Sequence, residues 1–314
     1  MLRLAASLVA FIAVMLSCSF ADAEVTVERT EDGLKIEIDG KPFANYATLS
    51  GNKPILWPII GPTGKEVTRQ YPMREAGEAE RADHPHHRSF WFTHGEVNGI
   101  SFWHEGDKTG TIKHREFAEL KSGETAVIKT VNDWLGPDGK KICEEASTYT
   151  FGGDENTRWI DAVCTIHATE EKDVVFGDTK EGSFGVRVAG TVKVDGDGKG
   201  SIINSKGHTN KDAWGKAAEW VDYHGPIEGE TVGIAILNHP DSFRHPTYWH
   251  VRTYGLFAAN PFGLNDFQRG KGLNGSHTLK QGESVTLRHR VLFHKGTHED
   301  AGIAKAYAAY AKEE

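Results

Sequence analysis

Histidines and aromatic residues are concentrated in the stretch ADHPHHRSFWFTHGEVNGISFWHE, residues 82–105. It contains five histidines, and four of them lie between His84 and His94. Histidine titrates near neutral pH, so it can give or take a proton in a cleft. Placing so many polar rings in an apolar stretch is costly unless each finds a partner. The stretch is therefore a candidate surface for acid/base chemistry, for a metal ion or for a sugar.

Acid/base chemistry requires a second titratable group beside the histidine. Asp83 precedes the first histidine, and Glu181 enters a predicted strand that also contains Arg187. Both carboxylates are candidates for the partner. For each residue taken singly, the alternatives are a histidine that only hydrogen-bonds a loop and a charge that only faces solvent.

His84 and His86 have the spacing of a metal-binding pair. Because the residue before a proline prefers an extended conformation, we expect His84 and His86 to point to one side and His87 to the other. This spacing begins a cupin metal site, but the carboxylate expected a few residues later is missing, since Glu96 lies ten residues beyond His86. Metal sites need three or four ligands. We therefore predict no metal cofactor, with a divalent ion at His84 and His86 as the alternative.

Aromatic side chains flank the histidines at Trp91, Phe92, Phe102 and Trp103. Rings with polar groups beside them make platforms for sugars. Alternation along a strand sends Trp91 and Phe92 to opposite sides, so some of these rings belong to the core. The stretch NHPDSFRHPTYWHVRTYG, residues 238–255, repeats the same residue types. We expect side chains from segments 84–94, 181–187 and 244–252 to line one cleft.

The elements that must position these residues read as β-strands. Apolar and polar residues alternate in many short segments, and Asp-Gly and Asn-Gly pairs mark turns between them. One helix is predicted at the C-terminus, with Thr297 as its cap and Asp300 in its first turn, and a shorter one around 212–220. Segments 51–83 and 204–227 are predicted to be ordered loops. The simplest architecture is all-β, one large antiparallel β-sandwich with a short C-terminal helix, and a barrel or two smaller sandwiches are the alternatives. The strand candidates are 126–131, 142–151, 158–168, 184–194, 231–237, 249–257 and 284–294.

The first 23 residues have the pattern of a secretory signal peptide. Arg3 is followed by an apolar run from Leu4 to Leu16 and by Ala21-Asp22-Ala23, a typical cleavage site. The run is too short to span a membrane. We expect export to the periplasm or the extracellular space, with no membrane insertion after cleavage; a signal anchor is one alternative, and lipidation at Cys18, whose preceding residues fit poorly, is another.

Charge and cysteines limit the partners and the chemistry. The formal net charge of -8 argues against nucleic acid as a partner. Cys143 and Cys164 remain after the predicted cleavage. A hairpin around Gly152-Gly153-Asp154 would bring them opposite each other, and export permits a disulfide. A bridge and two buried free thiols are both left open.

Short motifs spread over nearly the whole chain resemble those of the family called PmoA, or methane oxygenase PmoA. Together they are far more specific than any one of them. The matching segments are Asp83-His84-Pro85-His86-His87-Arg88, Trp91-Phe92, His94-Gly95, Asn98-Gly99, Phe102-Trp103, Lys180-Glu181-Gly182, Val186-Arg187-Val188, Ala213-Trp214-Gly215, Asn238-His239-Pro240, Arg252-Thr253-Tyr254-Gly255-Leu256, Asn260-Pro261-Phe262-Gly263 and His294-Lys295-Gly296.

This resemblance implies a single domain over residues 24–314, similar to the supersandwich of galactose mutarotase. It also implies a setting among the exported sugar-degrading proteins of bacteria. The family label itself fits poorly. A particulate methane oxygenase subunit crosses the membrane several times, and after residue 23 this chain has no apolar run of membrane length. A metal-dependent oxygenase is therefore the least favoured of three readings.

The first reading is a carbohydrate-active enzyme, an epimerase, lyase or hydrolase acting on a sugar or glycoside. The resemblance to mutarotase-like folds would make His86 or His94 the acid and Glu181 the base. Arg187 and Arg252 would orient substrate oxygens, and Trp91 or Trp103 would be the platform. The second reading is a non-catalytic glycan-binding protein. The residues expected to contact the sugar are His87, Trp91, Trp103, Arg187, Arg244, His245, Trp249 and Arg252.

Overall fold

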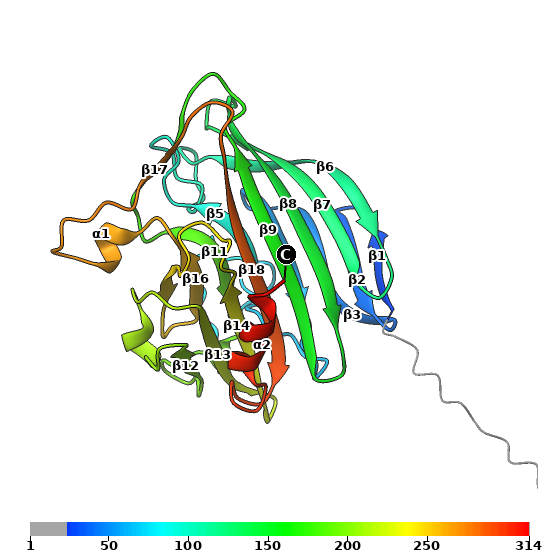
Figure 1. The fold of residues 1–314 in the computed structure, drawn as a ribbon. Coiled ribbons are helices and arrows are strands. Elements are labelled where there is room, and N and C mark those ends of the chain that lie inside the picture. The colour runs from blue at the N-terminus through cyan, green and yellow to red at the C-terminus, as the bar shows by residue number, and fades with distance from the viewer. Residues whose placement is uncertain (1–23, 314) are drawn as a thin grey trace, which may run out of the picture.

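A computed structural model describes residues 24–313 of the chain. The predicted signal peptide, residues 1–23, lies outside the described residues. Two eight-stranded sheets dominate this part of the chain and pack face to face (Figure 1). Neighbouring strands of both sheets pair antiparallel. The predicted class, a large antiparallel β-sandwich with a short C-terminal helix, is confirmed.

The first sheet has the order β1-β2-β3-β4-β5-β11-β16-β15. Its members are β1 (Val25–Arg29), β2 (Gly33–Ile38), β3 (Lys41–Ser50), β4 (Lys53–Ile59), β5 (Phe90–His94), β11 (Gly182–Arg187), β16 (Leu256–Asn260) and β15 (Tyr248–Val251).

The second sheet has the order β12-β13-β14-β18-β9-β8-β7-β6. Its members are β12 (Ser201–Asn204), β13 (Trp220–Ile227), β14 (Glu230–Asn238), β18 (Ser284–Lys295), β9 (Thr157–His167), β8 (Lys141–Gly153), β7 (Ala126–Leu135) and β6 (Thr111–Lys121). A two-stranded ribbon joins β10 (Val174–Phe176) to β17 (His277–Leu279), and the helical pieces are 3₁₀ turns at Gly190–Val192 and Asn210–Ala213, α1 (Leu264–Phe267) and α2 (Ile303–Tyr310).

Alternation decides which side chains enter the core. Along β9 every second residue is buried and faces the other sheet, as in a strand with one covered face. By contrast, all six residues of β11 are buried. Something must therefore cover the outer face of β11 as well, and the histidine-rich segment does so.

The segments expected to be loops contain strands. β4 lies within 51–83. It was not predicted from the sequence because it contains Pro54 and Pro58, and proline usually argues against a strand. β13 lies within 204–227, and the helix expected over 212–220 is only the 3₁₀ turn that ends at Ala213. The strand expected over 249–257 is divided, since a turn at Arg252–Gly255 separates β15 from β16.

The C-terminal helix begins later than the pattern predicts. The Asp300 carboxylate accepts two hydrogen bonds from Thr297. The Thr297 backbone N–H donates at 2.9 Å and its hydroxyl at 2.8 Å. This reciprocal pair closes a turn ahead of α2, which starts at Ile303. No helix within residues 24–313 is long and apolar enough to cross a membrane.

The predicted hairpin between the two cysteines exists, but the predicted pairing is wrong. β8 and β9 are antiparallel neighbours, with Cys164 opposite Ser147. Cys143 lies four residues from Ser147 along β8, which separates the two cysteines by about 13 Å. A disulfide requires Cα atoms within about 7 Å. Both thiols are free and buried.

We expect both cysteines to react as free thiols once the chain is unfolded. Burial raises the pKa of each thiol, so in the native protein both should react slowly. Mass spectrometry after alkylation in denaturant without reductant should show label at Cys143 and Cys164. A protein that gains label only after reduction would contradict the register of this hairpin.

Candidate active site

The candidate site lies on the outer face of the first sheet. In register across four strands stand Trp91 on β5, Gly185 on β11, Ala258 on β16 and His250 on β15. The residues on either side of Trp91, Phe90 and Phe92, point the other way and belong to the core. A Cβ at Gly185 would lie 2.8 Å from two atoms of the Trp91 ring. The absence of a side chain at this glycine therefore lets the indole lie across the sheet.

A buried arginine holds the histidine-rich loop against this face. Arg69 is 1% exposed, and its guanidinium donates to the backbone carbonyls of Asp83, His84 and His87 at 2.9, 2.7 and 3.0 Å. The Asp83 carboxylate accepts from Arg69 at 3.1 Å and from Arg187 at 3.3 Å. Two neighbouring arginines thus share one acid, and the loop wraps around them.

The expectation that this loop is extended is wrong. His84 is left-handed, with φ of 44°, and the His87 N–H donates to the His84 carbonyl at 3.0 Å. The turn brings the rings of His84, His86 and His87 together, with centroids 5.0 Å apart for His84 and His87 and 4.5 Å for His86 and His87. The hydrogen bonds from Arg69 to the loop carbonyls outweigh the preference of the residue before Pro85 for an extended conformation.

Replacing Arg69 by methionine should therefore destabilise the protein by about 3–5 kcal/mol, because several buried carbonyls and Asp83 lose their donor. Urea unfolding of Arg69→Met, compared with Arg81→Met at an exposed arginine of the same loop, measures the effect. Equal stability of the two variants would refute this role of Arg69.

A series of contacts runs along the exposed side of this face; we call it the histidine rim. Its eight members are His84, His86, His104, Glu181, His250, Trp214, Arg252 and Tyr254. The His86 ring lies 4.7 Å from that of His104 and 5.8 Å from that of His84. His84 stacks in parallel on Tyr254, with centroids 5.4 Å apart.

The rim continues through an arginine and a tryptophan. The Arg252 guanidinium lies 5.6 Å from the ring centre of Tyr254 and 5.8 Å from that of Trp214. The Trp214 ring lies 6.4 Å from that of His250. Glu181 lies near the two ends of this series, since the charges of His250 and His104 act on it, while its side chain pairs with Lys180. Residues from five separate parts of the chain therefore meet on one surface.

The surroundings of His86 and Glu181 lower the pKa of both side chains. Burial, with help from His104 and Lys53, lowers the pKa of His86 to about 3. Burial alone would raise the pKa of Glu181, but the hydrogen bond from Lys180 and the nearby His250 bring it below the usual value. At neutral pH His86 is uncharged and Glu181 is ionised, so neither carries a proton to donate, and their lowered pKa values make both weak bases. The expectation that His86 is the acid does not agree with this.

Buried N–H donors without an acceptor lie beneath the rim. Arg187 donates to Nδ1 of His87 at 3.0 Å, which leaves the proton of a neutral His87 on Nε2. That nitrogen and the indole nitrogens of Trp91 and Trp103 are buried and make no hydrogen bond. The three rings are mutual neighbours, with centroids 5.4–5.5 Å apart. Unpaired buried donors are costly, and their burial keeps these three N–H groups out of reach of a ligand at the rim.

Residues 33–308 match the model of a family of unknown function, DUF6807. The chain belongs to this family. The resemblance to the PmoA family stays a prediction. No curated protein matches the chain in sequence.

Several solved structures are similar to this DUF6807 chain, all at low identity. The GH36 α-galactosidase AgaA of Geobacillus stearothermophilus is 10% identical, with a TM-score of 0.40 over 87% of this chain and 40% of the enzyme. AgaB of the same organism is 12% identical, with a TM-score of 0.42 over 87% and 41%. The heparan sulfate lyase HepC of Pedobacter heparinus is 8% identical, with a TM-score of 0.39 over 88% and 36%. The chain spans about two fifths of the length of these enzymes.

The DUF6807 structure brings together only part of the predicted site. His86, His87, Glu181, Arg187 and Arg252 gather at or beneath the rim, and so do the predicted platforms Trp91 and Trp103, although both indoles are fully buried. A buried indole cannot be the stacking surface for a sugar; the partly exposed Trp214 offers that surface instead. The Tyr254 ring is also partly exposed, but His84 stacks on it and the guanidiniums of Arg187 and Arg252 lie over it.

His94 does not reach the rim. It is 1% exposed, and its ring nitrogens face the Gly177 carbonyl at 2.8 Å and the Ser183 hydroxyl at 3.2 Å. Phe176 and Phe262 pack against its ring. Because no substrate contacts a ring enclosed in this way, the structure removes His94 from the predicted acid/base pair.

Three other predicted contacts hold the fold together. Arg244 donates to the carbonyls of Pro261 and Ser276 at 3.0 and 2.9 Å. The His245 ring faces the Asn238 side chain at 2.9 Å, and the fully buried Trp249 indole donates to the Ala218 carbonyl at 2.9 Å. The expected single cleft from all three segments is therefore only partly realised.

The sequence reasoning missed His104, His250, Trp214 and Tyr254 as site residues. His104 ends the histidine-rich stretch, and His250 follows Trp249 in the second one. Trp214 and Tyr254 stand in motifs that carry the PmoA resemblance. The signal was present in each case, but only the packing of β15 and β16 against β11 shows that these side chains converge.

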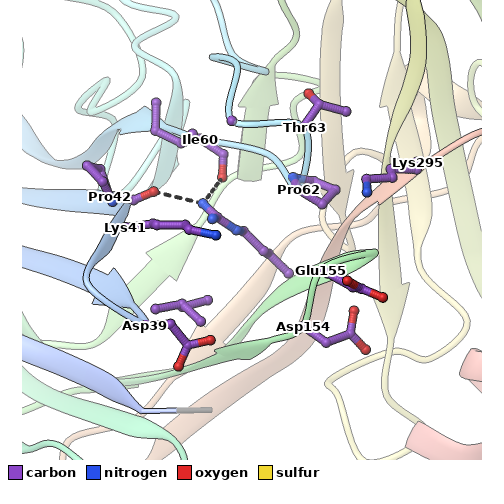
Figure 2. A pocket seen from close by; sticks show the side chains of 12 residues that line it. Asp39, Lys41, Pro42, Ile60, Pro62, Thr63, Asp154, Glu155 and Lys295 are labelled. Atoms are coloured by element: carbon purple, nitrogen blue, oxygen red, sulfur yellow. Dashed lines mark hydrogen bonds between the residues drawn. The ribbon is translucent and has the colours of Figure 1, made fainter.

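A cavity of about 610 Å³ lies elsewhere, where the ends of both sheets meet (Figure 2). Asp39, Lys41, Asp154, Glu155 and Lys295 line it, and a buried arginine, Arg158, donates into its wall at the Pro42 and Ile60 carbonyls. Its lining mixes acidic and basic residues, and it contains none of the predicted site residues. The histidine rim, which combines acid/base groups with aromatic faces, is the better candidate.

Proposed function

We propose that this protein binds a carbohydrate at the histidine rim and acts on it by proton transfer that involves His86 and Glu181. The observation that carries the proposal is the histidine rim itself. It places an ionised carboxylate, an uncharged histidine, two partly exposed aromatic rings and an arginine around one surface. The N-terminal sequence supports placing this activity outside the cytoplasm.

His86 and Glu181 would share the proton chemistry. The ring nitrogens of His86 make no hydrogen bond within the described part of the chain, so both are free for a substrate. A histidine with a lowered pKa stays uncharged at neutral pH. It is a weak base, and once it has taken a proton from the substrate it is a strong acid that can return the proton. Glu181, held by Lys180, would stabilise the positive charge on His86 while that ring holds the proton. Epimerisation, elimination and hydrolysis all use such groups.

Trp214, Tyr254 and Arg252 would bind the sugar. Flat rings with polar groups beside them suit the apolar face of a pyranose. The Arg252 guanidinium packs on both rings, and no acid within residues 24–313 pairs with it. A guanidinium free to donate several hydrogen bonds recognises a carboxylate well. We therefore propose a sugar that carries an acidic group, such as a uronic acid.

A non-catalytic glycan-binding protein is the second candidate. It is favoured by the low pKa of His86, because the rim then offers two proton acceptors and no charged imidazole as the acid. Such a protein would need Trp214, Tyr254 and Arg252 but would tolerate loss of His86. Measurement of binding and turnover on the same variants separates the two functions.

A metal-dependent oxygenase is not favoured for this surface. Within residues 24–313, no third histidine, cysteine or carboxylate stands with His84 and His86 at the spacing that metal ligands need. The proposal at the rim therefore uses no metal cofactor.

Binding to a panel of neutral and acidic oligosaccharides tests the proposal. We expect an acidic sugar to bind best, and Trp214→Ala or Tyr254→Ala to weaken binding by roughly tenfold or more. Tyr307→Ala, at a partly exposed tyrosine of α2, is the matched control. Equal affinity of all three variants would show that the sugar binds elsewhere, and equal binding of neutral and acidic sugars would remove the role of Arg252.

A further inference from the structure

A second group of histidines lies on the outer face of the second sheet, far in the fold from the histidine rim. Asp222 and His224 alternate on β13 and point to the same side, and His294 stands on β18. The strand between them, β14, pairs Gly233 with both His224 and His294. The C-terminal segment covers this face, with Ile303 and Tyr310 of α2 packed on the sheet (Figure 1).

Asp222 is the centre of this group. It is fully buried, and both of its oxygens face imidazoles, Oδ1 at 2.6 Å from Nδ1 of His224 and Oδ2 at 2.7 Å from Nε2 of His294. Among residues 24–313, no lysine or arginine forms an ion pair with Asp222. A buried carboxylate surrounded by histidines is typical of a metal site or of its immediate partners.

Gly233 makes room for the ring of His294. A Cβ on this glycine would lie 2.3 Å from two ring atoms of His294. Any side chain at 233 would push the imidazole away from Asp222. Gly233 therefore lies at the position on β14 where the His294 ring passes over the strand.

His298 is a third histidine of this group, and one of its ring nitrogens is buried without a partner. It lies in the segment between β18 and α2, and its ring stacks on that of His224 with centroids 5.7 Å apart. Its Nδ1 is buried and has no hydrogen-bond partner. Ligand atoms of Asp222, His224 and His298 all lie within 4.8 Å of one another. A buried nitrogen without a partner, next to a carboxylate and a second imidazole, is the arrangement that a cation completes.

We propose that Asp222, His224 and His298 bind a divalent metal ion, and that zinc is the best fit. Two imidazoles and one carboxylate suit zinc, which leaves a fourth position for another ligand. Ligands about 2.0 Å from the ion lie roughly 3.3 Å apart in a tetrahedron, so the 2.6 Å contact between Asp222 and His224 must widen slightly on binding.

His294 would orient the site from outside. It contacts the second oxygen of Asp222, and its other nitrogen, Nδ1, lies 3.2 Å from the Lys295 carbonyl. Partners of this kind fix the direction of a metal-binding carboxylate. Because His298 belongs to the segment that leads into α2, the ion would fix the C-terminal segment to the second sheet. This role is independent of the histidine rim and of the proposed function.

Zinc binding by the full chain tests the inference. Protein first dialysed against a chelator should take up about one zinc per chain, and its thermal midpoint should rise as zinc is added. His298→Ala, at a partly exposed position, should lose both effects and remain folded without metal. His167→Ala, at a partly exposed histidine of β9, should keep both. Uptake by His298→Ala equal to that of the parent would overturn the site.

Cobalt gives a second readout. The parent with one cobalt bound should show the absorption of a tetrahedral ion. His298→Cys should still bind cobalt and add a sulfur-to-cobalt charge-transfer band. Absence of that band, or loss of metal in His86→Ala instead of His298→Ala, would refute the assignment.

Discussion

Replacing His86 by alanine, or Glu181 by glutamine, should lower turnover of the carbohydrate substrate by about 100-fold or more while the protein stays folded. Positioned proton transfer typically contributes this much. Both side chains lie at the partly exposed rim and not in the sandwich core, so neither change should disturb the sheets. Steady-state rates over a range of pH measure the effect.

The shape of the pH profile separates a chemical role from a structural one. With the pKa of His86 near 3, the parent should keep its activity well below pH 6 and lose it only as His86 and Glu181 become protonated. His167→Ala and Glu171→Gln, on surfaces away from the rim, should retain full activity. Full turnover by His86→Ala with unchanged sugar binding would instead support the glycan-binding candidate.

Stability should fall steeply as the pH drops from about 6.5 toward 4. Burial lowers the pKa of His94 and His250 to about 4 and that of His289 to about 3, against about 6.5 in the unfolded chain. Below pH 6.5 these histidines are therefore protonated in the unfolded chain but remain uncharged in the folded protein, so acid favours unfolding. At pH 5 each of the three histidines stabilises the fold by about 2 kcal/mol less than at pH 8.

Urea unfolding at pH 8, 6.5, 5.5 and 5 measures this loss. His289→Gln should flatten the dependence, because one buried titrating ring is gone; His167→Gln should leave it unchanged. A free energy of unfolding that stays constant over this range would show that these rings are protonated in the folded protein.

The fold class could be predicted because alternation survives in the long strands. β7, β8, β9 and β18 each present buried residues at every second position, and turn residues separate them. β4 and β13 could not be found in this way. β4 carries two prolines, and β13 begins with four buried residues, so neither shows a clean period of two.

The site could be predicted in its residue types but not in its geometry. His86 and Arg252 are linked through His84 and Tyr254, and Glu181 lies near His250. The turn at His84 depends on Arg69, which lies in a segment that sequence reasoning treated as an ordinary loop. Likewise, His94 and Trp249 are residue types that suit a binding site. Alternation along β5 and β15 does not show which face of each strand is covered by loops, so it could not show that both side chains are buried.

The crystal structure of the protein with the oligosaccharide that it binds best tests the central claim most directly. We predict electron density for a sugar within the histidine rim, stacked on Trp214, with an oxygen in hydrogen-bond distance of His86 and an acidic group facing Arg252. Density for the sugar in the cavity beside Arg158, with no sugar at the rim, would contradict the account.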